Sequence, residues 1–295
     1  MSSLYSEAEI KAQEIWKDFE NQILHNNRYF IQHPVLDMIK NYVDSNKYTI
    51  NKGEIFYRAR IIDEAALGQD MMYLYYGGKT DENILEFKNF HSVENKFRGL
   101  TKDGCFVPPD NNKIKEGRAN PKFIKYLYLS EKPATAIFEV RPLLTDRINI
   151  AEIIVNEPLE VASIGIDLNI KNGTHEEYVL LHIQSAFSKP TYNPDDYIRT
   201  QIIAEYIKTL GFDGIRFNSS LHRGGVNLTI YNYEKCEPIS SQDYRIEDLK
   251  ITARPSASSD PRISNFWWIR DNEEIPYNYD EFKKKYNDVI VQKDK

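Results

Sequence analysis

Cysteine is scarce in this 295-residue sequence, which holds only Cys105 and Cys236. The two residues lie far apart and form no CxxC pair, so the sequence predicts neither a disulfide framework nor a zinc site. Scarce, unpaired cysteine is typical of a reducing compartment, and we expect the cytoplasm. The six histidines show no ligand spacing, so no bound metal is expected.

Long apolar runs and an excess of positive charge are also missing. No run of 18 apolar residues occurs, and the N-terminus, MSSLYSEAEIKAQEIW, carries early glutamates, so we expect neither a membrane span nor a signal peptide. The formal net charge of −6 argues against broad electrostatic binding to nucleic acid or anionic lipid. A local basic pocket is still compatible with this charge.

The common cofactor motifs are absent as well. No GxGxxG follows a predicted strand, which argues against a Rossmann dehydrogenase. No GxxxxGK[ST] or HExxH occurs, so a P-loop nucleotide hydrolase and a zinc protease of that type are excluded. What remains is an ordinary globular composition, with 41% hydrophobic and 28% charged residues.

Hydrophobic periodicity predicts a mixed α/β chain. Ile15, Phe19 and Ile23 repeat every four residues within a predicted helix over 6–25, and a second helix is predicted over 35–44. These two helices must cover the core domain, a second copy of the chain in a homodimer, or a partner protein. Strands are predicted over 53–61, 126–130, 147–155 and 159–165, and the last two can pair with each other.

The second half of the sequence continues with helices and then strands. Thr174 to Glu177 form a capping box for one helix, and Asn193 and Pro194 begin another that ends at Gly211. Two strands follow, FDGIRFN and VNLTIYN, joined by SSLHRGG. Residues 63–106 are predicted to be mostly irregular with one short helix, and 254–262 to be a linker before a Lys-rich final helix. The buried stripe of the helix that Asn193 begins is predicted at Ile198, Ile202, Tyr206 and Leu210.

Two stretches carry residues that packing alone does not explain. In Tyr57-Arg58-Ala59-Arg60, strand alternation puts both arginines on one face, either in an edge strand facing solvent or in a site. Ser130 can cap the next helix, and Pro133 falls in its first turn. Glu139 ends the apolar run of that helix, so we expect a half-buried carboxylate. Such a group needs hydrogen bonds or a charged partner, for which Arg141 is the plainest candidate.

A loop and a strand between these stretches, and a small-residue loop after them, add further polar groups. Arg118 and Asn120 lie in the loop GRANP, and Tyr128 follows in a strand. Ser219 and Ser220 begin a loop that also holds two glycines, which suits close approach to a phosphate or ribose. Taken alone, the loop is better explained as a plain hairpin turn. Arginine binds phosphate, tyrosine stacks on a flat ring, and a carboxylate stabilises a sugar cation.

The order of these motifs resembles the RES domain family. The resemblance rests on FYRAR, VPP…GRANP, YLYLS…TAIFEVRP and FDGIRFNSS…GGVNLTIY, and it covers roughly 53–235. The family is named for an arginine, a glutamate and a serine, which match Arg58, Glu139 and Ser219, with Ser220 as the alternative register. The expected organisation is an N-terminal helical extension (1–50), a RES catalytic domain (53–235) and a C-terminal extension (236–295).

The resemblance implies a compact α/β (α+β) fold, similar to ADP-ribosyltransferases, with small mixed sheets flanked by helices. It implies a bacterial toxin that cleaves the nicotinamide–ribose bond of NAD, with phosphate or water as acceptor, and that is controlled by an antitoxin. NAD is then the substrate, and no separate cofactor is expected. Protein ADP-ribosylation and a non-catalytic NAD-binding module are the alternatives; Ile137 and Arg141, two residues either side of the glutamate, argue against arginine as a protein acceptor.

The resemblance also assigns roles to the residues. Arg58 should bind the pyrophosphate, and Tyr57 and Tyr128 should offer rings to the nicotinamide. Glu139 should lie beside the nicotinamide ribose. Three further residues are expected to contact phosphate or ribose: Arg118, Asn120 and Ser219.

Overall fold

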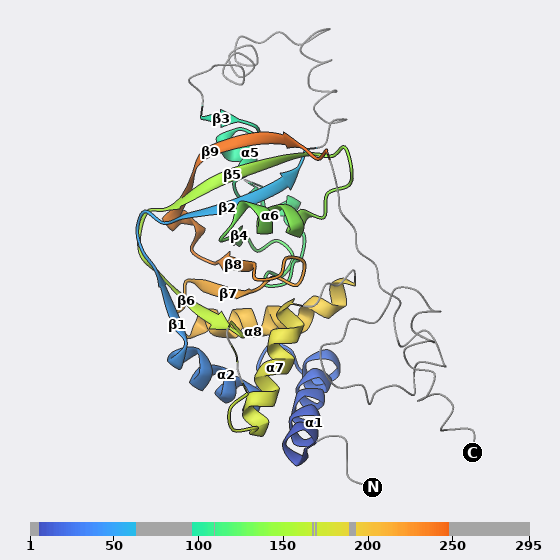
Figure 1. Cartoon of the computed structure of the whole chain (residues 1–295). Coiled ribbons are helices and arrows are strands. Elements are labelled where there is room, and N and C mark those ends of the chain that lie inside the picture. Colours follow the sequence, from blue (N-terminus) through green and yellow to red (C-terminus); the bar gives the residue numbers. More distant parts are fainter. Residues whose placement is uncertain are drawn as a thin grey trace, which may run out of the picture. The chain divides into compact units, whose positions relative to one another are not determined.

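The computed structural model describes residues 6–62 and 96–247, apart from 109, 167, 169 and 189–192. The expected α/β class is confirmed, since helices flank one mixed sheet (Figure 1). The predictions for 63–95 and for 248–295, including the linker and the final helix, lie outside the described residues. The three expected domain boundaries stay predictions. No helix within the described ranges has the length and apolar character needed to cross a membrane.

Nine strands of the described residues form the sheet, in the order β1-β6-β7-β8-β4-β2-β5-β9-β3. Neighbouring strands are antiparallel except for the pairs β6–β7 and β3–β9, which are parallel. The strands are β1 (Lys47–Ile50), β2 (Ile55–Ile61), β3 (Phe97–Arg98), β4 (Leu127–Ser130), β5 (Arg147–Val155), β6 (Leu159–Ile164), β7 (Gly214–Asn218), β8 (Val226–Ile230) and β9 (Cys236–Arg245).

The sheet is nearly divided at its centre. β2 and β4 are joined through a single residue pair, Tyr57 opposite Ser130, whereas β2 pairs with β5 along its whole length. One half is therefore β3-β9-β5-β2 and the other is β4-β8-β7-β6-β1 (Figure 1). The small sheets that we expected are the two halves of this one sheet.

The structure corrects two expectations about the strands. The strands over 147–155 and 159–165 do not pair, because β5 lies between β2 and β9 while β6 lies between β1 and β7. One of the two partners of β6 is β1, a short strand that the sequence analysis missed. β2 is an interior strand, so Arg58 and Arg60 do not lie on a solvated edge.

The helices gather mainly around the half of the sheet that ends in β1. α1 and α2 pack with α7 and α8 in one hydrophobic core, where Phe19, Ile39 and Phe187 are almost completely buried. The N-terminal helices thus cover their own chain. Within the described residues, the α-helices are α1 (Glu7–Asn21), α2 (Pro34–Ser45), α5 (Lys102–Cys105), α6 (Pro133–Val140), α7 (His175–Ser188) and α8 (Tyr197–Thr209).

The helix ends follow the sequence signals in part. Thr174 and Glu177 form the reciprocal bonds of a capping box before α7. Gly211, at a φ of 92°, follows the end of α8. The predicted buried stripe of α8 is wrong by about one residue. This helix packs against β7, α7 and α2 and so buries a wider face than the prediction assumed. Its buried residues are Thr200, Ile203, Ala204 and Ile207, while Ile202, Tyr206 and Leu210 are only partly buried.

Candidate active site

A cavity of about 450 Å³ lies where the two halves of the sheet meet, within the size range of small-molecule sites. β2 and β4, on either side of the single-pair joint, both line it, together with α6, the GRANP loop and the start of α8. Its lining residues are Tyr57, Arg58, Ala59, Gly117, Arg118, Tyr128, Leu129, Ser130, Ala136, Glu139, Val140, Arg141, Tyr197, Phe217 and Asn227.

α6 carries Glu139 to the edge of this cavity. Pro133 lies in the first turn, as expected, but it is the first residue of the helix. Lys132 and not Ser130 is the N-cap, and the Ser130 hydroxyl donates to Asn227 instead. The helix is less buried than its apolar sequence suggests: Phe138 is 49% exposed, and Glu139 is exposed rather than half-buried. A carboxylate at this position can meet a ligand that enters from solvent.

Two neutral donors hold the Glu139 carboxylate. The Ser219 hydroxyl donates to Oε1 at 2.6 Å, and the Asn227 amide donates to the same oxygen at 2.7 Å. These groups take the place of the Arg141 pairing that we considered. Glu139 and Ser219, which are 80 residues apart in the chain, are therefore in direct contact.

The loop between β7 and β8 fixes the Ser219 hydroxyl. Its oxygen accepts the backbone N–H groups of Leu221 and His222, at 3.2 and 3.1 Å, while it donates to Glu139. Gly225 lets this loop approach α6, because a Cβ atom there would lie 2.8 Å from the Thr135 side chain. Ser220 is exposed and does not line the cavity.

Arg58 enters the cavity as a cation without an acidic partner. Its Nη1 donates to the Tyr128 carbonyl at 3.3 Å, its buried Nε has no hydrogen-bond partner, and no ion pair of the described residues includes it. Burial, and to a lesser extent the neighbouring Arg60, lower the pKa of Arg58 to about 9, so it stays charged at neutral pH. A buried, charged and partly unsatisfied guanidinium is suited to bind an anion.

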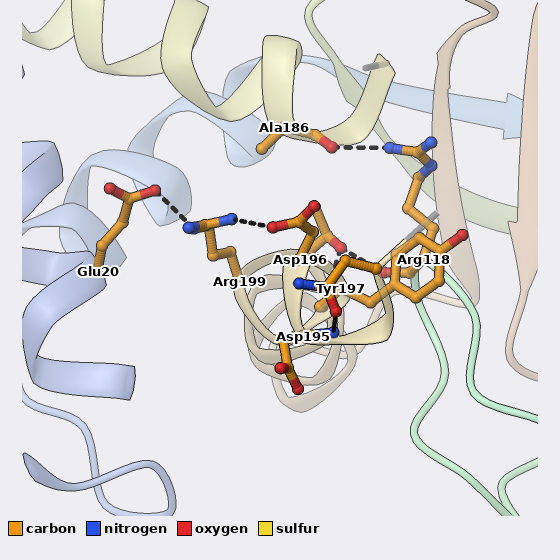
Figure 2. Close-up of polar contacts among 9 residues, drawn as sticks. Glu20, Arg118, Ala186, Asp195, Asp196, Tyr197 and Arg199 are labelled. Carbon is orange, nitrogen blue, oxygen red and sulfur yellow. Dashed lines mark hydrogen bonds and ion pairs between the residues drawn. The ribbon is translucent and has the colours of Figure 1, made fainter. Parts of the chain in front are cut away.

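Arg118 is held between α7 and α8 (Figure 2). Its Nη1 donates to the Ala186 carbonyl at 2.7 Å, near the negative end of the α7 dipole, and burial lowers the pKa of the guanidinium. The Tyr197 ring lies beside the guanidinium, with its centroid 6.0 Å from the guanidinium carbon. The Arg118 side chain is therefore fixed at the cavity wall.

The first helix braces this wall. Arg199 of α8 pairs with Glu20 of α1 at 2.5 Å and with Asp196 at 3.4 Å, as Figure 2 shows. One residue further along α8, Thr200 donates its hydroxyl to the Arg118 carbonyl at 2.5 Å. The N-terminal extension is thus linked to the arginine through α8.

Asn120 builds the GRANP loop and does not line the cavity. It is 3% exposed, and its Nδ2 donates to the carbonyls of Lys115, Pro121 and Ile124. Its Oδ1 accepts the Tyr128 hydroxyl at 2.7 Å, so Asn120 ties the loop to β4. Tyr128 itself is among the residues that line the cavity.

Four polar lining residues were not among the expected site residues: Ser130, Arg141, Tyr197 and Asn227. Asn227 had a usable signal, because a polar residue interrupts the otherwise apolar start of VNLTIYN. Arg141 and Tyr197 had none, since one simply follows a helix and the other begins one. Within the described residues, no group of three or more His, Cys, Asp or Glu side chains is arranged to hold a metal ion.

Comparisons with known proteins bear on the family. The family model of the RES domain matches residues 97–251, more than half of the sequence, and includes all the expected site residues except Tyr57 and Arg58. No curated protein matches the chain. A similar solved structure is the crystal structure of the M. tuberculosis MbcT-MbcA toxin-antitoxin complex, with a TM-score of 0.34 and 14% identity over 72% of this chain and 93% of that chain. On the extent of the family match, the chain belongs to the RES domain family.

Proposed function

We propose that this RES domain cleaves the bond between nicotinamide and ribose in NAD. One observation carries the proposal: the hydrogen-bonded carboxylate of Glu139 and the unpaired cation of Arg58 line the same cavity. A carboxylate and a separate anion-binding group are what a glycosidic bond next to a pyrophosphate requires.

The charges of the cavity suit a phosphate-containing ligand in an otherwise acidic protein. Three arginines and one glutamate are among the lining residues, whereas the whole chain has a net charge of −6. Arg58 lines the cavity and its guanidinium has a donor without a partner, so we expect it to bind a pyrophosphate oxygen. Tyr57 and Tyr128 line the cavity and would stack on a flat ring.

In the proposed reaction the main task of the protein is to stabilise the positive charge that develops on the ribose. The nicotinamide of NAD carries a positive ring nitrogen, so it leaves with the bonding electron pair and becomes neutral without protonation. Positive charge then develops on the ribose, and the Glu139 carboxylate would stabilise it. Water or phosphate would complete the reaction by attaching its oxygen to the anomeric carbon and losing a proton.

Product analysis tests the proposal directly. Purified protein is incubated with NAD, with and without phosphate, and the products are separated. Free nicotinamide with ADP-ribose indicates water as acceptor, and nicotinamide with a phosphorylated ADP-ribose indicates phosphate. Intact NAD after prolonged incubation with folded protein would contradict the proposal. ADP-ribose attached to a protein would instead support the transferase alternative.

The family membership supports a bacterial toxin as the setting of this activity. The proposed partner is an antitoxin protein, and the proposed location is the cytoplasm. Expression of the chain alone should then lower cellular NAD and stop growth, and the same effect from a Glu139→Gln variant would exclude NAD cleavage as its cause.

A further inference from the structure

Asn227 is placed to control which oxygen of Glu139 meets the substrate. Both donors to the carboxylate act on Oε1, from Ser219 at 2.6 Å and from Asn227 at 2.7 Å. No described residue donates a hydrogen bond to Oε2, although Glu139 lines the cavity. A carboxylate held through one oxygen has a fixed orientation and keeps the other oxygen available.

Ser130 fixes the Asn227 amide in turn. An ionised carboxylate only accepts hydrogen bonds, so Asn227 must turn its NH₂ group toward Glu139 and its carbonyl away. That carbonyl accepts the Ser130 hydroxyl at 2.8 Å. Ser130 and Asn227 are opposite residues of β4 and β8, and both are buried, at 3% and 6% exposure. The chain of bonds therefore runs from rigid sheet to reacting carboxylate.

We propose that Asn227, oriented by Ser130, is a positioning residue that presents Glu139 Oε2 to the ribose of the substrate. The inference rests on the proposed NAD cleavage. It adds a second support to the carboxylate besides Ser219, and the two supports come from different elements. Ser219 lies on a loop, whereas Asn227 lies within a central strand.

The first test removes the amide. Asn227→Ala should lower kcat for NAD cleavage roughly 10- to 100-fold, the range expected for a misplaced catalytic group, and leave KM within about twofold. Thr229→Val is the matched control, because Thr229 lies on the same strand but does not line the cavity, and its kinetics should equal wild type. An unchanged kcat in folded Asn227→Ala would overturn the inference.

The second test restores the donor by pH. In Asn227→Asp, a protonated aspartate can donate to Glu139 as the amide does, whereas an ionised one repels the carboxylate. Its activity should therefore approach wild type at low pH and fall as pH rises, along a limb that the wild type lacks. A purely structural role would give the same relative loss at every pH, and that result would also overturn the inference.

A third variant tests the hydrogen bond between Ser130 and Asn227. It also provides a test of the inference if the Asn227 variants do not fold. Ser130→Ala should lower kcat less than Asn227→Ala and should add nothing to the Asn227→Ala variant, because the two act in series. Additive losses would contradict the series.

Failure of the proposed function would be visible separately, as wild-type protein that leaves NAD intact. Crystal structures of wild type and Asn227→Ala would then decide the positioning role. A Glu139 carboxylate that keeps its orientation without the amide would overturn it.

Discussion

The two halves of the sheet bring opposite kinds of group to the cavity. The half that ends in β2 supplies Arg58, whose buried Nε has no partner. The other half supplies Asn227 and the loop of Ser219, which satisfy the Glu139 oxygen Oε1 twice. The carboxylate side is thus held by groups of the protein itself, whereas the cation side still lacks a hydrogen-bond partner that a ligand anion would supply. The difference predicts that changes on one side alter catalysis and changes on the other alter affinity.

The largest effect is expected on the carboxylate side. Glu139→Gln keeps the size of the side chain and removes its charge, so the fold should survive while kcat for NAD cleavage falls at least ~100-fold, or about 2.7 kcal/mol of transition-state stabilisation. Initial rates, with thermal unfolding as the check on folding, measure this. A variant that cleaves NAD at the wild-type rate would show that Glu139 has a structural role only.

On the cation side, Arg58→Lys should weaken NAD binding about tenfold, because lysine cannot bind phosphate through two nitrogens. Nicotinamide riboside lacks the pyrophosphate, so its affinity should hardly change. Calorimetric titration with both ligands measures the difference. Arg60→Lys is the matched control: Arg60 donates to the carbonyls of Gly104 and Phe106 and does not line the cavity. Equal losses for both ligands would contradict the assignment.

Tyr128 lies on β4, beside β8, and its carbonyl accepts a hydrogen bond from Arg58. Ionisation of its hydroxyl should make the free energy of unfolding depend on pH. Burial raises the pKa of its hydroxyl to about 12 from an ordinary value of 10, so between these pH values the folded state keeps a proton that the unfolded state has lost. Stability therefore falls as pH rises from 10 to 12. Tyr128→Phe should reduce that slope and cost about 1 kcal/mol at neutral pH, because the Ala119 N–H and Asn120 Oδ1 lose their partner.

Denaturant unfolding of wild type and Tyr128→Phe across this pH range checks both effects. Other tyrosines and lysines titrate there too, so the difference between the two proteins is the quantity that matters. Identical slopes would mean that the hydroxyl is not buried as the structure has it.

Sequence patterns predicted the parts of the site that depend on local chemistry. The strand with Arg58, the helix that ends near Glu139 and the small-residue loop of Ser219 all occur where periodicity and glycine placed them. The resemblance to the RES family then indicated that these distant segments belong together. The cavity contains five of the eight expected residues: Tyr57, Arg58, Arg118, Tyr128 and Glu139.

What the sequence could not predict depends on long-range pairing. β5 and β6 are adjacent in sequence, and both have the residue pattern of a strand. They pair with strands that lie far away in the chain, β5 with β9 and β6 with β1. Asn120 was predicted to contact a ligand because the sequence does not show its hydrogen bonds to carbonyl groups of its own loop. Those bonds form only in the folded loop. Asn227 was missed because its hydrogen-bond partners, Ser130 and Glu139, lie 97 and 88 residues away in the chain.

The smallest expected effect is a change in stability on removal of the Thr229 hydroxyl, a buried polar group on neither side of the cavity. Thr229 is fully buried in β8, and its hydroxyl has no hydrogen-bond partner, as for the Arg58 Nε, but it lies outside the cavity lining. If an unsatisfied group is retained for ligand binding only where it faces the cavity, this hydroxyl should be dispensable. Thr229→Val should raise the free energy of unfolding by about 0.5 kcal/mol, since it removes a buried donor without a partner at nearly constant shape. Denaturant unfolding measures the gain, and NAD cleavage should be unchanged. A loss of stability would mean that a water molecule or another group satisfies the hydroxyl in solution, and the contrast with Arg58 would then rest on charge alone.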